Sequence, residues 1–541
     1  MKRNIFSITM FAVLSVLVIS CGRGDKSGLA IPMDASVVVH INSGSLTKKL
    51  SWDEIKQTNW FKELYADADD SLAKKIMDNP GASGIDVEKD MAFFVKKQGR
   101  GGYMVFEGSV KDASAFETFN KQINKDATSS KSGDLTIMKL KEGGVLSYDA
   151  SRFVYVLNAP NLGGGFAAMG GQSQPNEPYS FPADSLQMFG AVLYDLPSDQ
   201  SMYKDDRFDA TMKEAGDLHV WINNEKTYGG MASGMMSMLK VNALFDKNAT
   251  GMAVNFENGK IAIRSKQFFG KDILKLLEKY PPKDVSADVV NRIPSQNVVA
   301  AMVMNYQPEG LKEFLKLLGL DGGANAYMQE VGYSVDEFVK ANKGDIVLVA
   351  SDLRMDNPKD TTVAGDEGDN STQLSNGPEI KYLFATSVND KAAFNKMVTI
   401  IATQVKDLER MGMPKLSYTV SDNWFAAGNS EEQVKQFLAG GKTTQPFASR
   451  ISGQPFGAFV DLHKLIEAGS AVFSGKDDNN AMLDASLKMW QDILITGGKT
   501  KNGAMNYDVE INLVDKNINS LKQLNQYFDK LSLAKKDTVS F

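Results

Sequence analysis

Short apolar segments bounded by turn residues recur along the chain. The first covers residues 37–41 (Val-Val-Val-His-Ile), follows a turn over residues 31–36 and precedes a helical pattern. A similar arrangement returns at residues 298–304, again after an Ile-Pro turn over residues 293–297. Segments of this kind are typical of β-strands. The pattern therefore predicts two stretches of chain that each begin with a turn, a strand and a helix.

The two stretches continue in the same order of expected elements. Apolar segments that indicate strands, hairpins and helices in the first stretch return at matching places in the second. The matched pairs are residues 103–116 with 382–394, 207–222 with 446–461, and 251–263 with 503–512. Each stretch ends in an amphipathic helical pattern. We therefore predict an internal duplication with its junction near Pro281 and Pro282, because a helix does not continue through two prolines.

The expected fold class is α+β, with two similar halves that each form a largely antiparallel sheet covered by helices. Consecutive short strands with hairpin-like connections argue against a doubly wound parallel sheet, whose strands need long crossovers. The first half is expected over residues 30–281 and the second over residues 282–541. Within the first half, residues 51–76 show helical spacing of apolar residues, and Asp112 is expected to cap a later helix.

The N-terminal residues have the features of a signal peptide. Two basic residues precede a nearly continuous apolar run over residues 5–19, which is short for a membrane span. The run ends in residues 18–21 (Val-Ile-Ser-Cys), which resemble a bacterial lipobox: an aliphatic residue at −3, a small residue at −1 and then the cysteine. We predict a lipoprotein signal peptide over residues 1–20 and a polar tether over residues 21–29.

The resemblance to a lipobox implies a lipid anchor at Cys21. In proteins with this motif the thiol carries diacylglycerol, the preceding peptide is removed, and the new amine receives an acyl chain such as palmitate. Several chains hold a protein on a membrane far more stably than one chain. Gly22 after the cysteine favours the outer membrane of Gram-negative bacteria. The tether lacks an acidic cluster, which favours the periplasmic side, although the sequence leaves both sides open.

Composition narrows the classes of function. The chain has 541 residues, with 66 acidic and 60 basic residues and a formal net charge of −6. This near balance, without a basic run, disfavours a nucleic-acid partner. Cys21 is the only cysteine, which excludes an intrachain disulfide and a cysteine-based zinc site. Three histidines are too few for a histidine-rich metal site, and we expect no cofactor.

A methionine-rich segment is the candidate binding surface. It covers residues 231–239 and contains Met231, Met235, Met236 and Met238. Unbranched, polarizable methionine side chains adapt to varied apolar partners, so the segment is a candidate groove for a lipid, a peptide or a partner helix. The alternative is a core helix that packs on the sheet. Exposure of the methionines would favour the binding role.

Candidate catalytic and ion-binding motifs are incomplete. The glycines at residues 163–165 lack the Lys-Ser/Thr of a phosphate loop, and residues 366–370 lack the spacing of a calcium loop. His40 and His219 fall in separate expected strands, and His463 follows Asp461 at the start of an expected helix, where capping explains the pair. No Gly-x-Ser-x-Gly elbow supports a serine hydrolase. We therefore name no catalytic residue.

The lipobox, the doubled strand and helix pattern and the Ile-Pro starts together resemble a family of uncharacterised Gram-negative lipoproteins that is known as a domain of unknown function. The resemblance covers nearly the whole mature chain and implies no activity. The leading hypothesis is a lipid-anchored cell-envelope protein of non-enzymatic binding or scaffold type, with an envelope protein, lipid or peptide as partner. The alternative is an envelope hydrolase whose carboxylates are brought together by the fold.

Overall fold

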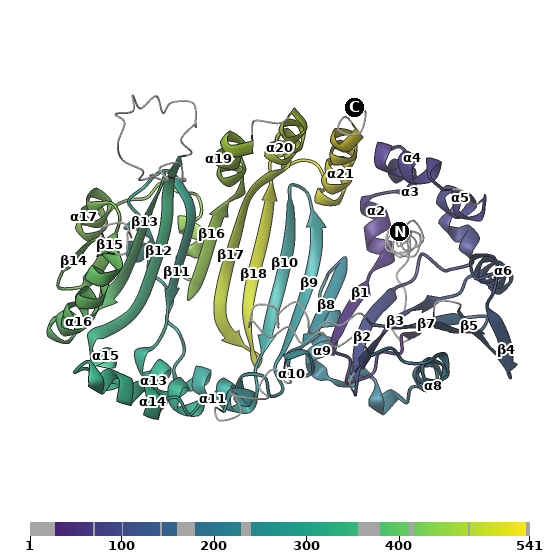
Figure 1. The fold of residues 1–541 in the computed structure, drawn as a ribbon, viewed down its shortest axis with the longest axis horizontal. Helices are drawn as coiled ribbons and strands as arrows, with labels where there is room; N and C mark the ends of the chain where they lie inside the picture. Colours follow the sequence, from purple (N-terminus) through teal and green to yellow (C-terminus); the bar gives the residue numbers. More distant parts are fainter. Residues whose placement is uncertain are drawn as a thin grey trace, which may run out of the picture.

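The computed structural model describes residues 28–68, 71–99, 101–140, 143–159, 179–228, 240–354, 379–410, 416–473 and 477–536. Within these residues all eighteen strands belong to one sheet, and neighbouring strands are antiparallel (Figure 1). Across the sheet the order is β4 (Thr128–Ser132), β5 (Leu135–Lys139), β6 (Val145–Tyr148), β7 (Arg152–Asn158), β3 (Gly101–Ser109), β2 (Met91–Gln98), β1 (Val37–Ile41), β8 (Leu218–Asn223), β9 (Ala249–Glu257), β10 (Lys260–Phe268), β18 (Ala504–Leu513), β17 (Trp490–Lys501), β16 (Phe456–Asp461), β11 (Val298–Asn305), β12 (Asn342–Arg354), β13 (Glu379–Val388), β15 (Trp424–Gly428) and β14 (Ser417–Val420).

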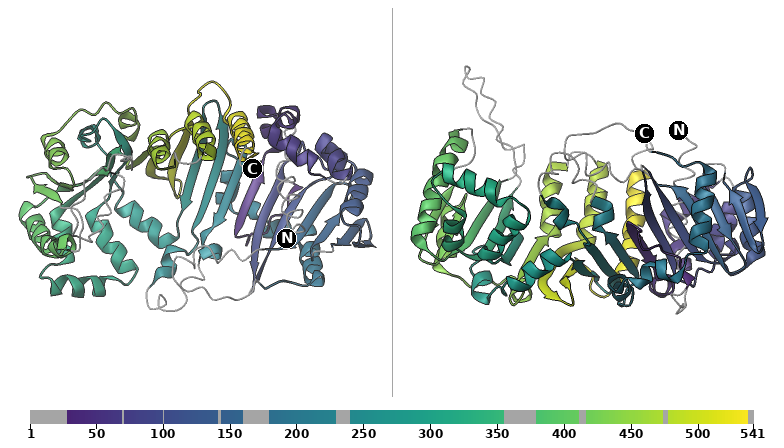
Figure 2. Two further views of the ribbon diagram at one scale, coloured as in Figure 1. Left: turned by 45° about the horizontal axis from the view of Figure 1, so that its top comes forward. Right: turned by 90° about the horizontal axis from the view of Figure 1, so that it is seen from below.

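From each side of the sheet toward its centre, seven strands follow one another with corresponding connections along the chain. One series is β7, β3, β2, β1, β8, β9 and β10, and the other is β15, β13, β12, β11, β16, β17 and β18. The two series meet where β10 pairs with β18 over nine residue pairs. The expected α+β class with a largely antiparallel sheet is confirmed, and both predicted halves contribute strands to a single sheet, which runs as one layer through the molecule (Figure 2).

Helices lie at the ends of the strands and on both faces of the sheet. The described helices are α2 (Ser43–Lys49), α3 (Trp52–Lys56), α4 (Asn59–Ala66), α5 (Ser71–Asp78), α6 (Ala113–Ile123), α8 (Ala183–Tyr194), α9 (Asp206–Met212), α10 (Asn224–Tyr228), α11 (Lys271–Lys279), α12 (Ala287–Asn291), α13 (Pro308–Leu317), α14 (Asp321–Glu330), α15 (Val335–Ala341), α16 (Lys391–Arg410), α17 (Glu431–Ala439), α18 (Ala448–Ile451), α19 (Leu462–Phe473), α20 (Asp477–Met489) and α21 (Ser520–Lys536). Short 3-10 helices are η2 (Pro80–Ser83), η4 (Ser198–Gln200), η5 (Met202–Lys204) and η8 (Val241–Leu244). Around the central strands, α19, α20 and α21 stand at one end and α11, α13 and α14 at the other (Figure 1).

Local signals explain how several helices begin. Asp112 caps α6 as expected, because its Oδ1 accepts a hydrogen bond from the backbone N–H of Ala115 at 2.9 Å. The helical stretch expected over residues 51–76 is present, and it consists of three short helices, α3, α4 and α5. Ser51 and Glu54 form a capping box that starts α3, and the Thr58 hydroxyl donates to the Ile55 carbonyl in the turn that ends it.

The two faces of the sheet are packed differently. We call the face that carries His40 and His219 the histidine face, and the opposite face the apolar face. Helices α8 and α9 cover the histidine face in the first half, and α12, α17 and α18 cover it in the second. On the apolar face, α6 covers β2, β3 and β5 to β7 through Phe116, and α16 covers β13 to β15 through Phe394. The centre of the apolar face, from β12 to β9, contributes to none of the described hydrophobic clusters.

No helix within the described ranges combines the length and the apolar character that a membrane crossing requires.

Candidate functional site

A continuous row of apolar side chains crosses the apolar face. Residues that pair across an antiparallel sheet point to the same face, so the pairings trace the row directly. It runs over ten successive strands through Phe384, Leu348, Met302, Ala458, Ile495, Val509, Ile263, Val254, Leu218 and Ile41. We call this set the apolar row. Strands lie about 4.8 Å apart, so the row is about 43 Å long.

Side chains of the apolar row are half-exposed or exposed. Leu348 is 40% exposed and Phe384 is 37% exposed, whereas the next residues along the same strands, Val349 and Ala385, are buried on the histidine face. The neighbouring row through Tyr382, Ala350, Ala300, Val460, Ile493, Ile511, Ile261 and Phe256 also carries no charge. A contiguous exposed apolar surface of this kind marks a place of interaction.

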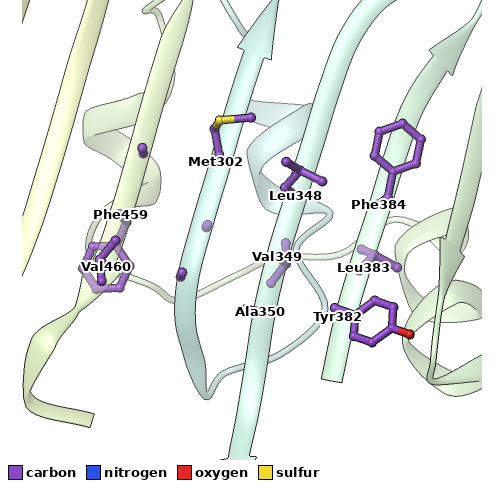
Figure 3. A pocket seen from close by; sticks show the side chains of 12 residues that line it. Met302, Leu348, Val349, Ala350, Tyr382, Leu383, Phe384, Phe459 and Val460 are labelled. Carbon is purple, nitrogen blue, oxygen red and sulfur yellow. The ribbon is translucent and has the colours of Figure 1, made fainter. Parts of the chain in front are cut away.

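A hollow of about 330 Å³ lies in the second half of this surface, over β16, β11, β12 and β13. Small alanines at positions 300, 350 and 458 form part of its lining, among the larger side chains of the two rows. Met302, Leu348 and Phe384 stand side by side on three neighbouring strands, with Tyr382 beside Phe384 (Figure 3). The hollow is lined by no charged side chain, so it suits hydrocarbon rather than a charged ligand.

The same central strands carry charged groups on their other face. Glu510 on β18 accepts from Lys260 Nζ at 2.8 Å and forms an ion pair with the Arg450 guanidinium at 3.1 Å. Burial alone would raise the pKa of Glu510, but the hydrogen bonds from Arg450 and Lys260 outweigh it and hold this pKa below its usual value. Arg264 and Asp508, which pair across β10 and β18, are exposed on this face.

A second polar feature is buried in the first half. His40 on β1 and His219 on β8 are direct cross-strand partners, and their Nδ1 atoms lie 3.2 Å apart. The outer nitrogen of His219, Nε2, lies 2.9 Å from the Glu214 carbonyl oxygen. The outer nitrogen of His40, Nε2, lies at ion-pair distance from Asp90 Oδ2, 3.1 Å, without the alignment of a hydrogen bond. Both imidazoles are at most 1% exposed. The sequence placed these histidines in separate strands, and the sheet brings them together.

Glu107 extends this buried polar row. It pairs across the sheet with Ala92, which pairs with His40, so all three point to the histidine face. Both carboxylate oxygens lie 2.9 Å from the backbone nitrogen of Ala30, where the chain enters the fold. Burial raises the pKa of Glu107 to about 7, although the hydrogen bond from Ala30 and the charge of Arg152 act in the opposite direction.

Most residues singled out from the sequence lie outside the described residues. These are Cys21, Met231, Met235, Met236 and Met238, together with the glycine-rich loop and the acidic insertion with residues 366–370. The anchor and the methionine-rich surface therefore stay predictions. The expected capping by Asp461 is confirmed, since its Oδ1 accepts from the backbone N–H of Lys464 at 2.9 Å in the first turn of α19, which contains His463.

The apolar row was missed from the sequence for a physical reason. Strands β11 and β12 carry apolar residues at both alternate sets of positions over residues 298–304 and 346–350. A strand of this composition normally lies in a sheet that is covered on both faces. The signal for an apolar face was therefore present, but the partial exposure of its centre among the described residues could be seen only after the helices were placed.

Comparison with known proteins identifies a family but no activity. The family described as "Domain of unknown function (DUF4836)" matches residues 29–158 and 183–444. No curated protein matches the chain. Three solved structures of crystal forms of TP0453 are similar to it at 11% identity: form I (47% of this chain and 86% of that chain, TM-score 0.22), form IV (46% and 85%, 0.25) and form III (50% and 87%, 0.22). Likeness at this level carries no argument about the site. The family match covers more than half of the chain, which therefore belongs to the DUF4836 family.

Proposed function

We propose that this protein is a lipid-anchored protein of the bacterial cell envelope that holds an apolar partner on the apolar face of its sheet and catalyses no reaction. The observation that carries the proposal is the apolar row, which crosses ten strands without a charge and, from β12 to β9, contributes to none of the described hydrophobic clusters. Covering about 300 Å² of such surface contributes about 7 kcal/mol of gross hydrophobic free energy. The lost freedom of the partner offsets part of that contribution.

The chemistry of the face supports hydrocarbon chains of a lipid as the partner. The apolar row offers no side-chain hydrogen-bond donor or acceptor. An extended peptide lying on it would leave backbone N–H and C=O groups without partners, at a cost of about 1–3 kcal/mol for each buried group. An acyl chain has no such groups. A partner helix satisfies its own backbone and is the second outcome that the test distinguishes.

Native mass spectrometry of the protein purified gently from cell envelopes, with lipid extraction alongside, tests this function. We expect co-purifying lipid, and at least tenfold less lipid with Leu348→Glu, because the new charge would have to lose its water beneath the ligand. Tyr327→Glu is the matched control, since Tyr327 is 62% exposed on α14, outside the apolar row. Wild-type lipid content in Leu348→Glu would refute the site, and a bound protein in place of lipid would refute the lipid class.

The proposal includes the anchor at Cys21 and the envelope location. It is supported by the lipobox in residues 18–21, by the preceding apolar run and by the polar tether. Mass spectrometry of the N-terminal peptide tests it: we expect a diacylglycerol-modified and acylated Cys21, and release of the protein from membranes by Cys21→Ala. An unmodified cysteine, with unchanged fractionation of the variant, would contradict the anchor.

We also propose that the two halves of the fold arose by internal duplication. The matched strand order on the two sides of the β10–β18 pair supports it, as does the matched order of sequence segments. β1 and β11 hold the same place in the two series, and so do β8 and β16. The hairpin of β4 and β5 is an addition in the first series. No observation favours the hydrolase alternative, because the hollow over β11 and β12 is lined by no carboxylate.

A further inference from the structure

The tautomers of the buried histidines follow from their contacts. The Glu214 carbonyl oxygen can only accept a hydrogen bond, so Nε2 of His219 carries a proton and donates it. A neutral His219 then has a bare Nδ1, which accepts from Nδ1 of His40. Consequently, a neutral His40 would have a bare Nε2. That nitrogen would face the carboxylate of Asp90 at 3.1 Å, so two acceptors would lie in contact.

We propose that these three residues form a proton-binding site, in which His40 is an imidazolium, His219 is neutral and Asp90 is the counter-charge. The extra proton on Nε2 of His40 turns the repulsive contact with Asp90 into an ion pair. The proton is assigned to His40 rather than to Asp90, because imidazole is the stronger base of the two groups. His40 is fully buried, and a buried charge is stable only with such a partner.

A metal ion between the two Nδ1 atoms is the competing interpretation. Zinc takes four ligands from protein and water, and other transition metals have similar demands. Over the described part of the chain, no group of three or more His, Cys, Asp or Glu residues could hold an ion. Two imidazole nitrogens in a buried place leave the remaining positions of a metal without ligands. A proton needs only the donor and the acceptor that are present.

The charged groups around the site have partners of their own. Asp217, next to β8, forms an ion pair with Lys49 of α2 at 2.6 Å, and the carboxylate of Glu214 forms one with Lys266 of β10. On the β3 side, burial raises the pKa of Glu107 to about 7. Tyr203 of η5 lies near Asp90 and Glu107, and burial, followed by these two negative charges, raises its pKa. His40 is therefore the cation that balances Asp90.

The bound proton makes the stability of the first half depend on pH in two directions. In the unfolded chain each of the two histidines is half protonated at about pH 6.5. Together they therefore bind one proton more than two neutral imidazoles. The folded site also holds one, so the two states match near pH 6.5. Above it the folded state binds more protons, so stability falls as pH rises. Below it the unfolded state binds up to two, so stability falls as pH falls.

Nitrogen-15 NMR of the histidines in the full-length protein tests the assignment directly. The chain has only three histidines, and His463→Gln removes the third set of signals. At pH 7.5, where a free imidazole is mostly neutral, we expect His40 to be protonated at both ring nitrogens and His219 only at Nε2. One proton on each ring at this pH would overturn the proposal. A ring nitrogen signal that disappears on treatment with a chelator would also overturn it, in favour of a metal.

Denaturant unfolding between pH 5 and 9 provides the second measurement. The stability difference between the wild type and His40→Gln/His219→Gln should be largest near pH 6.5. Above and below roughly pH 6.5, the ratio of the folding equilibrium constant of the wild type to that of the double variant should fall by up to tenfold per pH unit. His463→Gln is the control and should keep the wild-type profile. A difference that does not change with pH would contradict the proposal, and the NMR assignment decides the matter if the double variant does not fold.

Discussion

The central strands of the sheet have opposite characters on their two faces. On β10 and β18, Ile263 and Val509 belong to the apolar row, whereas their neighbours Arg264 and Asp508 lie on the histidine face and are exposed. In an ordinary antiparallel sheet the charged face meets water and the apolar face meets a core. Here the charged face follows this rule, while the apolar face stays half-exposed. The comparison indicates that a surface patterned for burial stays partly exposed in the part of the chain that the structure describes.

The outer parts of the sheet show what such a cover looks like. There α6 and α16 lie on the apolar face, and Phe116 and Phe394 are at most 1% exposed in the clusters they form with the strands. Between these two helices, from β12 to β9, the same face retains its apolar pattern but contributes to none of the hydrophobic clusters of the described residues. A partner that supplies hydrocarbon would complete the packing, and covering the surface is favourable in proportion to its area.

The largest contrast between the faces should be in stability. Phe437 on α17 is fully buried in the cluster on the histidine face, so Phe437→Ala should cost about 3–5 kcal/mol of unfolding free energy. Phe384→Ala removes a ring that is 37% exposed on the apolar face and should cost about 1 kcal/mol. Urea denaturation of both variants gives the comparison. Equal losses would show that the apolar face is packed in solution.

The buried carboxyl group of Glu107 on the histidine face should make the free energy of unfolding depend on pH. Burial raises the pKa of Glu107 from 4.5 to about 7, so the folded state holds a proton there that the unfolded state releases above about pH 4.5. Stability from this group is therefore present at low pH and is lost as pH rises through 7. Glu107→Gln should gain about 3 kcal/mol over the wild type at pH 8 and nothing at pH 4. Denaturation at these two values measures it, and a gain that is equal at both would contradict the assignment.

Neighbouring residues of β18 offer the sharpest test of binding. Val509→Lys places a charge in the apolar row, and Asp508→Lys changes charge on the opposite face one residue away. We expect bound lipid to fall about tenfold in the first variant, which corresponds to about 1.4 kcal/mol of binding free energy. It should be unchanged in the second. Lipid extraction from both proteins decides, and an equal loss in the two would place the ligand elsewhere.

The smallest effect is expected at the charged face. Glu510→Gln removes the negative charge that pairs with Lys260 and Arg450, and should cost about 1 kcal/mol at pH 7. Because the folded pKa of Glu510 is lowered, this contribution is present above the usual carboxyl range and is lost as pH falls through the folded value. Unfolding measured in steps from pH 7 downward follows the loss. A cost that stays the same at every pH would mean packing rather than charge.

Local sequence signals predicted individual elements well. The cap at Asp112 and the cap at Asp461 follow from short-range patterns, and the structure contains both. The helical stretch over residues 51–76 was predicted less well, since three helices with separate starts occupy it. The periodicity of apolar residues shows which side of a helix faces the core. Several short helices that pack on one core show the same periodicity, so the pattern does not reveal where one helix ends and the next begins.

Contacts between distant segments could not be predicted in this way. His40 and His219 are 179 residues apart, and only the pairing of β1 with β8 puts their rings in contact. Glu107 joins their row because β2 and β3 continue the same register. A sequence read locally shows three unrelated polar residues inside apolar strands. Their position in one row is a property of the sheet.

The sequence by itself determined the family, the antiparallel strands and the alternation that makes one face of each central strand apolar. Only the tertiary structure decided that β10 and β18 join the two series of strands into one sheet and that the centre of its apolar face, from β12 to β9, enters none of the described hydrophobic clusters. The physical reason is that alternation depends on neighbours along the strand, which are two residues apart. Burial depends on which distant segments pack over that strand.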